Sequence, residues 1–195
     1  MLRYLLLRNP GHNRVYYLES EKLALAELTL TTKRFDQPSD NIESIDIAGI
    51  NYLSFTVGQH LSENELIWLS NLSFVFALYQ QSEDSTESSL HPVALTPHSY
   101  VDSKISMLLK YGGKTNEIFT RLMINVGLIT SDYNLADSIQ MLDPVAGKGT
   151  TLFEGAVRGF DVTGIEMERK MVHETTVFFK RFLEQDKYKH TLSKH

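Results

Sequence analysis

Hydrophobic and polar residues follow one another in short segments along the first 80 positions, and this pattern predicts strands separated by helices. Apolar runs or strict alternation, both typical of strands, occupy Arg3–Leu7, Ser44–Ile50, Tyr52–Val57 and Phe74–Tyr79, and Val15–Tyr17 is expected to continue the first of them.

Two further segments predict helices. Leucine, alanine and glutamate dominate Glu19–Leu28, as in many helices. Ser62 and Glu65 have the spacing of a capping box, in which each side chain accepts a hydrogen bond from the other residue's backbone, so a helix is expected to begin there. The order strand-helix-strand-strand-helix-strand predicts an α+β unit over residues 1–80. Its arrangement is ferredoxin-like, with two helices on one face of a four-stranded antiparallel sheet.

A polar stretch without periodicity follows this unit, reading Gln-Gln-Ser-Glu-Asp-Ser-Thr-Glu-Ser-Ser from Gln80 to Ser89. Such a composition cannot bury a face against a core. It therefore predicts a linker or a mobile loop over residues 81–90, between an amino-terminal domain at 1–80 and a second domain at 91–195.

The second domain has a different pattern. Helices are expected over Pro97–Tyr111 and over 116–127, with Thr115 as the N-cap and Gly127 as the stop. Strand, helix, strand and helix then follow at 138–142, 150–158, 160–165 and 169–185. This alternation predicts parallel strands and an α/β part, the first half of a Rossmann-like, doubly wound domain.

Composition narrows the class of protein. The chain has 195 residues, no cysteine, 42% hydrophobic and 22% charged residues, which is typical of a globular protein. No apolar run reaches the roughly 18 residues of a membrane span, so no membrane partner is expected, and the absence of cysteine suits the cytoplasm. The histidines lack the spacing of a metal site. A net charge of −5 argues against a basic surface over the whole protein, but residues 169–195 carry seven Lys or Arg and only three acids.

Candidate chemistry is concentrated where the strand at 138–142 meets the next helix. Asp143 stands at the carboxyl end of that strand, where doubly wound sheets bind ligands. Gly147 and Gly149 allow a positive φ and a close approach of the backbone to a ligand. Glu166 ends the second strand 19 residues after Gly147, a spacing suited to accepting hydrogen bonds from ribose hydroxyls. An ordinary strand-to-helix turn is the plain alternative for the glycines.

The two carboxylates favour a ligand that combines an ammonium group with a ribose over a bare polyphosphate. The run Gly147-Lys148-Gly149-Thr150 is not a P-loop, because Ser or Thr does not follow the Gly-Lys pair directly. It is not the dinucleotide fingerprint either, since the third glycine is missing. Lys148 is expected to be a solvated loop lysine whose ammonium reaches water.

The run Leu-Asp-Pro-x-x-Gly-x-Gly-Thr resembles the S-adenosylmethionine motif of class I methyltransferases acting on nucleic acids, although Val145 and Ala146 replace the Phe and Cys usual in that motif. It is most similar to the RNA methylases that include the tRNA guanine-N2 methyltransferases, in which an amino-terminal ferredoxin-like domain helps to bind RNA. The resemblance implies S-adenosylmethionine as cofactor and a base amino group in RNA, rather than DNA, as target. It implies that the cofactor is held by these residues: Asp143, Pro144, Ala146, Gly147, Gly149, Thr150 and Glu166. Among them, the glycines would line the methionine part, Asp143 the ammonium and Glu166 the ribose.

The chain departs from these relatives in one respect that concerns activity. Their later Asp/Asn/Ser-Pro-Pro-aromatic motif, which grips the target amino group, has no match here, because the sequence contains no Pro-Pro pair. No catalytic residue is therefore assigned, and this chain alone is expected to be inactive. It is read as the amino-terminal part of a methyltransferase, with exposed apolar sheet or helix surface that favours self-association. The alternative is a non-catalytic RNA-binding or assembly module with a degenerate cofactor cleft.

Overall fold

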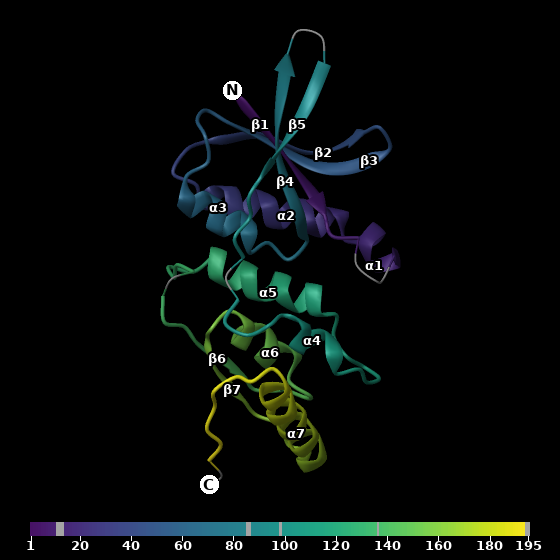
Figure 1. Cartoon of the computed structure of the whole chain (residues 1–195), viewed down its shortest axis with the longest axis vertical. Coiled ribbons are helices and arrows are strands. Elements are labelled where there is room, and N and C mark those ends of the chain that lie inside the picture. Colours follow the sequence, from purple (N-terminus) through teal and green to yellow (C-terminus); the bar gives the residue numbers. More distant parts are fainter. Residues whose placement is uncertain (11–13, 85–86, 98, 136, 194–195) are drawn as a thin grey trace. The chain divides into compact units, whose positions relative to one another are not determined.

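The structure is a computed structural model, and it describes residues 1–10, 14–84, 87–97, 99–135 and 137–193 (Figure 1). The protein is a mixed α/β chain whose larger sheet is antiparallel. It divides into two compact units, which are described separately. Unit 1 comprises Met1–His98 with Arg121–Asp137, and unit 2 comprises Ser99–Thr120 with Ser138–His195.

Unit 1 is built on a five-stranded sheet in the order β2-β3-β1-β4-β5, in which every neighbouring pair is antiparallel. The strands are β1 (Leu2–Arg8), β2 (Ser39–Ile47), β3 (Ile50–Val57), β4 (Val75–Asp84) and β5 (Glu87–Val93). The first four correspond to the predicted strands, with β1 at the centre between β3 and β4. Two crossovers follow from this order, one from β1 to β2 and one from β3 to β4.

The helices α2 (Glu21–Thr31) and α3 (Glu63–Ser70) make these crossovers and cover the same face of the sheet (Figure 1). Leu28 from α2 and Leu69 from α3 are fully buried in one cluster with Leu6 and Phe55 from the strands. The ring of Tyr4 stacks on that of Phe55 with the centroids 5.5 Å apart. The predicted pair of helices on one sheet face is therefore confirmed.

The predicted capping box at the start of α3 is also confirmed. The Ser62 hydroxyl accepts the Glu65 N–H at 3.2 Å, and the Glu65 carboxylate accepts the Ser62 N–H at 2.8 Å. Glu65 is fully buried, and its carboxylate also accepts the Asp36 N–H and the Gln37 side-chain amide. Glu65, which the sequence identifies as a capping residue, therefore also fixes the loop that precedes β2.

Two predictions for unit 1 are wrong. The polar stretch expected to be a linker at 81–90 lies mostly in β4 and β5, which pair from Leu78 with Val93 to Asp84 with Glu87; residues 85–86 lie outside the described part. An edge hairpin needs no continuous apolar face, because hydrogen bonds to the neighbouring strand satisfy its backbone. Polar composition therefore did not exclude strands there.

The second wrong prediction concerns Val15–Tyr17, which is helical and lies within α1 (Arg14–Glu19). A short 3₁₀ turn, η1 (Thr32–Arg34), follows α2.

Helix α5 (Glu117–Ile129) begins one residue later than Thr115 suggests and runs past Gly127. Asn116 is its cap, because its side-chain oxygen accepts the N–H groups of Ile118 and Phe119 at 2.9 and 3.1 Å. The carboxyl-terminal part of this helix belongs to unit 1. There Asn125 is buried and donates to the Glu27 carboxylate at 2.6 Å.

Unit 2 contains α4 (Lys104–Leu108), β6 (Gln140–Asp143), α6 (Thr150–Val157), β7 (Asp161–Gly164) and α7 (Arg169–Gln185). Strands β6 and β7 pair in parallel from Gln140 with Asp161 to Asp143 with Gly164, as predicted. Helix α6 packs so closely on these strands that a Cβ on Gly155 would overlap the side chains of Met141 and Val162. Phe153 and Phe182 join α6 to α7 in the core of this unit.

The helix predicted over Pro97–Tyr111 is much shorter than expected. Asp102 accepts the Lys104 N–H through its side chain, and α4 begins only at Lys104. Leu109 has an extended backbone and ends it, ahead of Gly112 and Gly113. Among the residues that the structure describes, no helix combines the length and apolar character that crossing a membrane requires.

Candidate functional site

The loop from β6 to α6 is shaped by three of the predicted site residues. The Asp143 carboxylate accepts the Val145 N–H at 3.0 Å, which turns the chain as it leaves β6. Gly147 and Gly149 both have positive φ, 52° and 83°, and Gly149 is the N-cap of α6. These left-handed conformations are the reason for glycine at both positions.

Glu166 ties this loop to the chain beyond β7. One carboxylate oxygen accepts the Gly147 N–H at 2.9 Å and the other accepts the Glu168 N–H at 2.8 Å. The Ala146 N–H donates to the Ile165 carbonyl at 2.9 Å, continuing the connection between the two strand ends. The glycine loop and the acid that the sequence places 19 residues later are therefore in direct contact.

Tight packing holds the loop from two further sides. A Cβ on Gly149 would lie 3.1 Å from the Thr175 methyl group of α7 and 3.6 Å from the ring of Phe153. A Cβ on Gly164 would lie 2.9 Å from that of Ala146. Gly147, by contrast, has no heavy atom within 4 Å of the corresponding position. The backbone at Gly147 thus faces open space, while Gly149 faces α7.

A cleft of about 430 Å³ opens beside this loop within unit 2. It is lined by residues of the loop, of the segment before α5 and of α7: Tyr111, Gly112, Gly113, Thr115, Asp143, Val145, Ala146, Gly147, Lys148, Thr150, Thr151 and Met171. Four of the seven predicted site residues, Asp143, Ala146, Gly147 and Thr150, are among them. Pro144, Gly149 and Glu166 are not among the described lining residues, and Glu166 reaches the cleft through its bond to Gly147.

Two residues beside the loop, Tyr111 and Glu174, were not identified as site residues from the sequence. The Tyr111 hydroxyl lies 3.0 Å from the Thr150 hydroxyl at the start of α6. The Lys148 ammonium lies 5.1 Å from the centre of the Tyr111 ring and forms an ion pair of 2.6 Å with Glu174 of α7. Tyr111 directly precedes Gly112 and Gly113, a pattern that could have drawn attention to it. No sequence pattern links Lys148 with Glu174.

The prediction for Lys148 is therefore wrong. Its side chain is only 21% exposed and is paired, because α7 brings a carboxylate to the loop. The hydrogen bond from Lys148 lowers the pKa of the Glu174 carboxyl below its ordinary value of 4.5, and the charges of Lys170 and His173 act in the same direction. The Glu174 carboxyl is consequently ionised at neutral pH.

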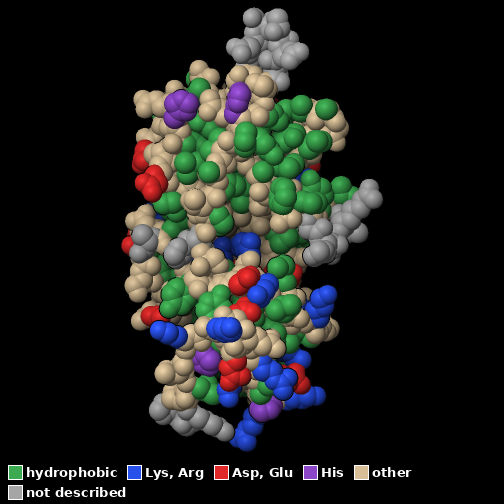
Figure 2. All heavy atoms as spheres, viewed as in Figure 1, with side chains coloured by type: hydrophobic (Ala, Val, Ile, Leu, Met, Phe, Trp, Pro, Cys, Tyr) green, Lys and Arg blue, Asp and Glu red, His purple; other side chains and the backbone are tan. Residues whose placement is uncertain are grey.

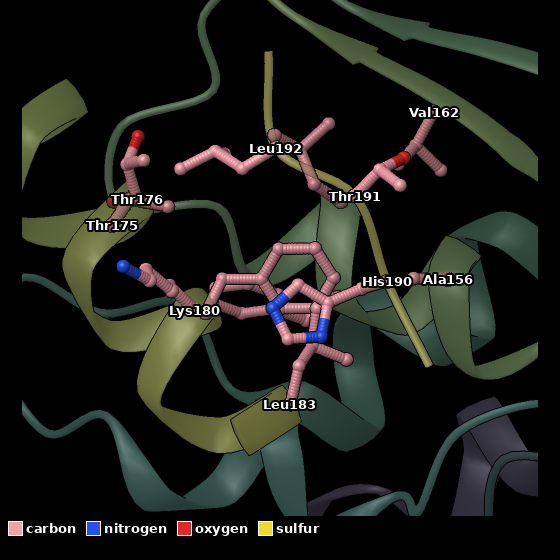
Figure 3. A pocket seen from close by; sticks show the side chains of 12 residues that line it. Ala156, Val162, Thr175, Thr176, Lys180, Leu183, His190, Thr191 and Leu192 are labelled. Carbon is pink, nitrogen blue, oxygen red and sulfur yellow. The ribbon is translucent and has the colours of Figure 1, made fainter. Parts of the chain in front are cut away.

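A second cavity of about 290 Å³ lies in unit 2 between α6, α7, β7 and the chain after α7 (Figure 3). Its walls are mostly aliphatic and aromatic side chains, and Figure 3 shows Lys180 and His190 beside Leu183 there. None of the predicted site residues lines it. The described residues also hold no group of three or more His, Asp or Glu side chains placed to bind a metal ion.

The chemistry of the first cleft suits a ligand with donor groups and a positive charge. Asp143 lines it with a carboxylate, and the Glu166 carboxylate, which has about four lone-pair positions, uses two of them for backbone N–H groups. Tyr111 offers an aromatic face. These carboxylates can accept hydrogen bonds from a ligand that carries donor groups and a positive charge.

Comparison with known proteins leaves the family open: no protein-family model matches the sequence, and no curated protein is significantly similar to it.

Proposed function

We propose that unit 2 binds S-adenosylmethionine in the cleft beside the β6–α6 loop, as the cofactor-binding part of a methyltransferase that acts on a base amino group in RNA such as tRNA. The observation that carries the proposal is the contact between Glu166 and Gly147, with Asp143 on the same loop. An acid at the end of the second strand is held against the glycine loop of the first, which is where a ribose and an amino acid moiety would meet.

The order of strands and helices in each unit supports this assignment. We propose that unit 1 is ferredoxin-like, because β1 to β4 follow the split order with both crossover helices on one face, and β5 is an added edge strand. We propose that unit 2 is Rossmann-like, because β6, α6 and β7 form a parallel β-α-β unit with the glycine loop at its first turn.

Each site residue has a definite part in this proposal. Asp143 attracts the ammonium group, Glu166 accepts the ribose hydroxyls with its remaining lone pairs, and the backbone at Gly147 lies against the methionine chain. The cofactor, when bound, supplies an electrophilic methyl group on a positively charged sulfur. No residue of this chain is assigned to hold the target amino group.

The distribution of charge bears on where RNA would be bound. Unit 1 has fourteen acidic and seven basic residues, whereas unit 2 has ten acidic and twelve basic residues. On the face that Figure 2 displays, Lys and Arg side chains gather over unit 2. Six basic residues in and after α7 are exposed: Arg169, Lys170, Lys180, Arg181, Lys187 and Lys189. We propose that phosphate contacts are made by these side chains rather than by unit 1.

Isothermal titration of S-adenosylmethionine tests the proposal. The wild-type chain should bind it, and Glu166→Ala should weaken binding by about tenfold or more, as expected when ribose acceptors and the order of the loop are both lost. Glu168→Ala is the matched control, because only the backbone of that neighbouring acid takes part in the loop. A wild-type chain that binds RNA but no S-adenosylmethionine would instead favour the non-catalytic RNA-binding module.

A further inference from the structure

We propose that Glu174 on α7 determines the charge preference of this cleft: by pairing with Lys148 it neutralises a repulsive cation in the lining and so admits a positively charged ligand. The inference rests on the proposed function and names a residue that sets ligand specificity without contacting the reacting atoms. Lys148 stands between the two glycines of a loop that we expect to hold a sulfonium ion, so its positive charge would repel that of the ligand.

The geometry shows how the conflict is resolved. The ammonium of Lys148 lies 2.6 Å from a Glu174 carboxylate oxygen and 5.1 Å from the centre of the Tyr111 ring. Both side chains are partly shielded from water, with exposed fractions of 21% and 37%. The positive charge at the cleft wall is thus matched by a carboxylate on its outer side and by an aromatic face on the other.

Helix α7 holds Glu174 in this place through neighbouring contacts. Met171 lines the cleft and Thr175 lies against Gly149, so three residues with i, i+3 and i+4 spacing face the same loop. The amino-terminal half of α7 is therefore a fixed wall beside the glycine loop. A carboxylate on this wall can act on Lys148 without itself entering the cleft.

The electrostatic consequence differs between two ligands of nearly the same shape. S-adenosylmethionine carries a sulfonium charge that S-adenosylhomocysteine lacks, and the two otherwise share ammonium, carboxylate and ribose groups. If Lys148 lost its partner, its free charge would oppose the sulfonium and leave the neutral thioether almost unaffected. The charges of Lys170 and His173 also act on Glu174, and they are present in all the variants compared below.

The experiment compares the affinities of both ligands by isothermal titration in four chains: wild type, Glu174→Gln, Lys148→Met and the double variant. Glu174→Gln should weaken S-adenosylmethionine about two- to fivefold, the size expected for a partly exposed charge pair, and leave S-adenosylhomocysteine within error. Lys148→Met should shift the preference toward S-adenosylmethionine. The double variant should return it near the wild-type ratio. Glu184→Gln is the control, because Glu184 pairs with Lys180 on the same helix, away from the cleft.

The outcomes separate the two proposals. If the wild-type chain binds neither ligand, the proposed function fails and this inference fails with it. If the wild-type chain binds both, but Glu174→Gln leaves the ratio of the two affinities unchanged, the pair only supports the structure and the inference alone is overturned. The Lys148→Met chain keeps the test decisive if Glu174→Gln does not fold, since it must raise the preference for S-adenosylmethionine.

Discussion

The carboxylate of Glu166 accepts the backbone N–H of Gly147 at 2.9 Å, although 19 residues separate them in the chain. Its second oxygen accepts the Glu168 N–H, so one side chain orders both the glycine loop and the turn after β7. This relationship makes Glu166 a structural residue of the site as well as a candidate ligand contact. Its two roles can be separated by measurements made without ligand.

Replacing Glu166 with alanine should loosen the loop even when no ligand is present. Two backbone N–H groups lose their acceptor, which should lower the free energy of unfolding by about 1–2 kcal/mol. Amide hydrogen exchange at Gly147 and Glu168 should become faster, while exchange in unit 1 stays unchanged. Unaltered exchange at both amides would show that the carboxylate does not order the loop.

The two glycines of the loop should respond differently to alanine. In Gly149→Ala, the alanine must adopt a left-handed φ of 83°, and its Cβ would lie 3.1 Å from the Thr175 methyl group. The substitution should therefore destabilise the chain by about 2 kcal/mol. Gly147→Ala meets only the backbone strain, at φ 52° in open space, and should cost about 1 kcal/mol. Urea denaturation followed by circular dichroism measures both; equal losses would contradict the packing of α7 on Gly149.

The ion pair between Lys148 and Glu174 should give a pH dependence at acid pH. The Glu174 carboxyl has its pKa lowered from 4.5, chiefly by the hydrogen bond from Lys148. The pair's contribution is therefore complete above pH 4.5 and is lost as the pH falls through the lowered pKa. Carbon NMR should place the Glu174 midpoint below 4.5, and Lys148→Met should move it upward. A wild-type midpoint at or above 4.5 would refute the pair.

Local rules were sufficient for most elements of this fold. Apolar runs and alternation identified β1 to β4, the capping box identified the start of α3, and the 169–185 helix was predicted with the limits that α7 has. The polar hairpin at 81–90 was missed because an edge strand is stabilised by its ladder and not by a buried face. Composition alone therefore misassigned it as a linker.

The site was predictable only as far as it lies in one stretch of sequence. The loop from Asp143 to Thr150 was identified because strand, glycines and helix are consecutive. Glu174 could not be found this way, because its place depends on how a following helix packs against the loop. For Tyr111 the only signal is the Gly112-Gly113 pair that follows it. Long-range packing leaves no periodic trace in a single sequence.

A buried polar network in unit 1 gives a further test. Glu27 accepts hydrogen bonds from the Asn125 side chain at 2.6 Å and from the Ser73 hydroxyl, and Asn125 also donates to the Asn71 carbonyl at 2.8 Å. Asn125→Ala would leave the buried carboxylate and this carbonyl with fewer donors, and should cost about 2–3 kcal/mol. Thr130→Ala on the exposed end of α5 is the control and should cost less than about 0.5 kcal/mol. Equal costs in urea denaturation would contradict the network.

One face of the small parallel sheet of unit 2 is turned away from α6. Met141 and Val162 face α6, and because strand side chains alternate, Leu142 and Thr163 face the other way. Leu142 is 59% exposed, and Ile165 and Val145 beside it are also exposed. Parallel sheets are normally covered on both faces, so we expect this chain to self-associate through the β6–β7 face.

Sedimentation velocity over a range of concentrations measures this association. Leu142→Lys should shift the equilibrium toward monomer and reduce the binding of a hydrophobic dye, because it places a charge in the centre of the apolar face. Phe76→Lys is the matched control: Phe76 is 62% exposed, but it lies in β4 of the antiparallel sheet of unit 1 and not on the β6–β7 face. Its association should equal that of the wild type. If both substitutions shift the equilibrium toward monomer equally, the β6–β7 face is not the surface that associates. The same conclusion follows if the wild type is monomeric and binds no dye.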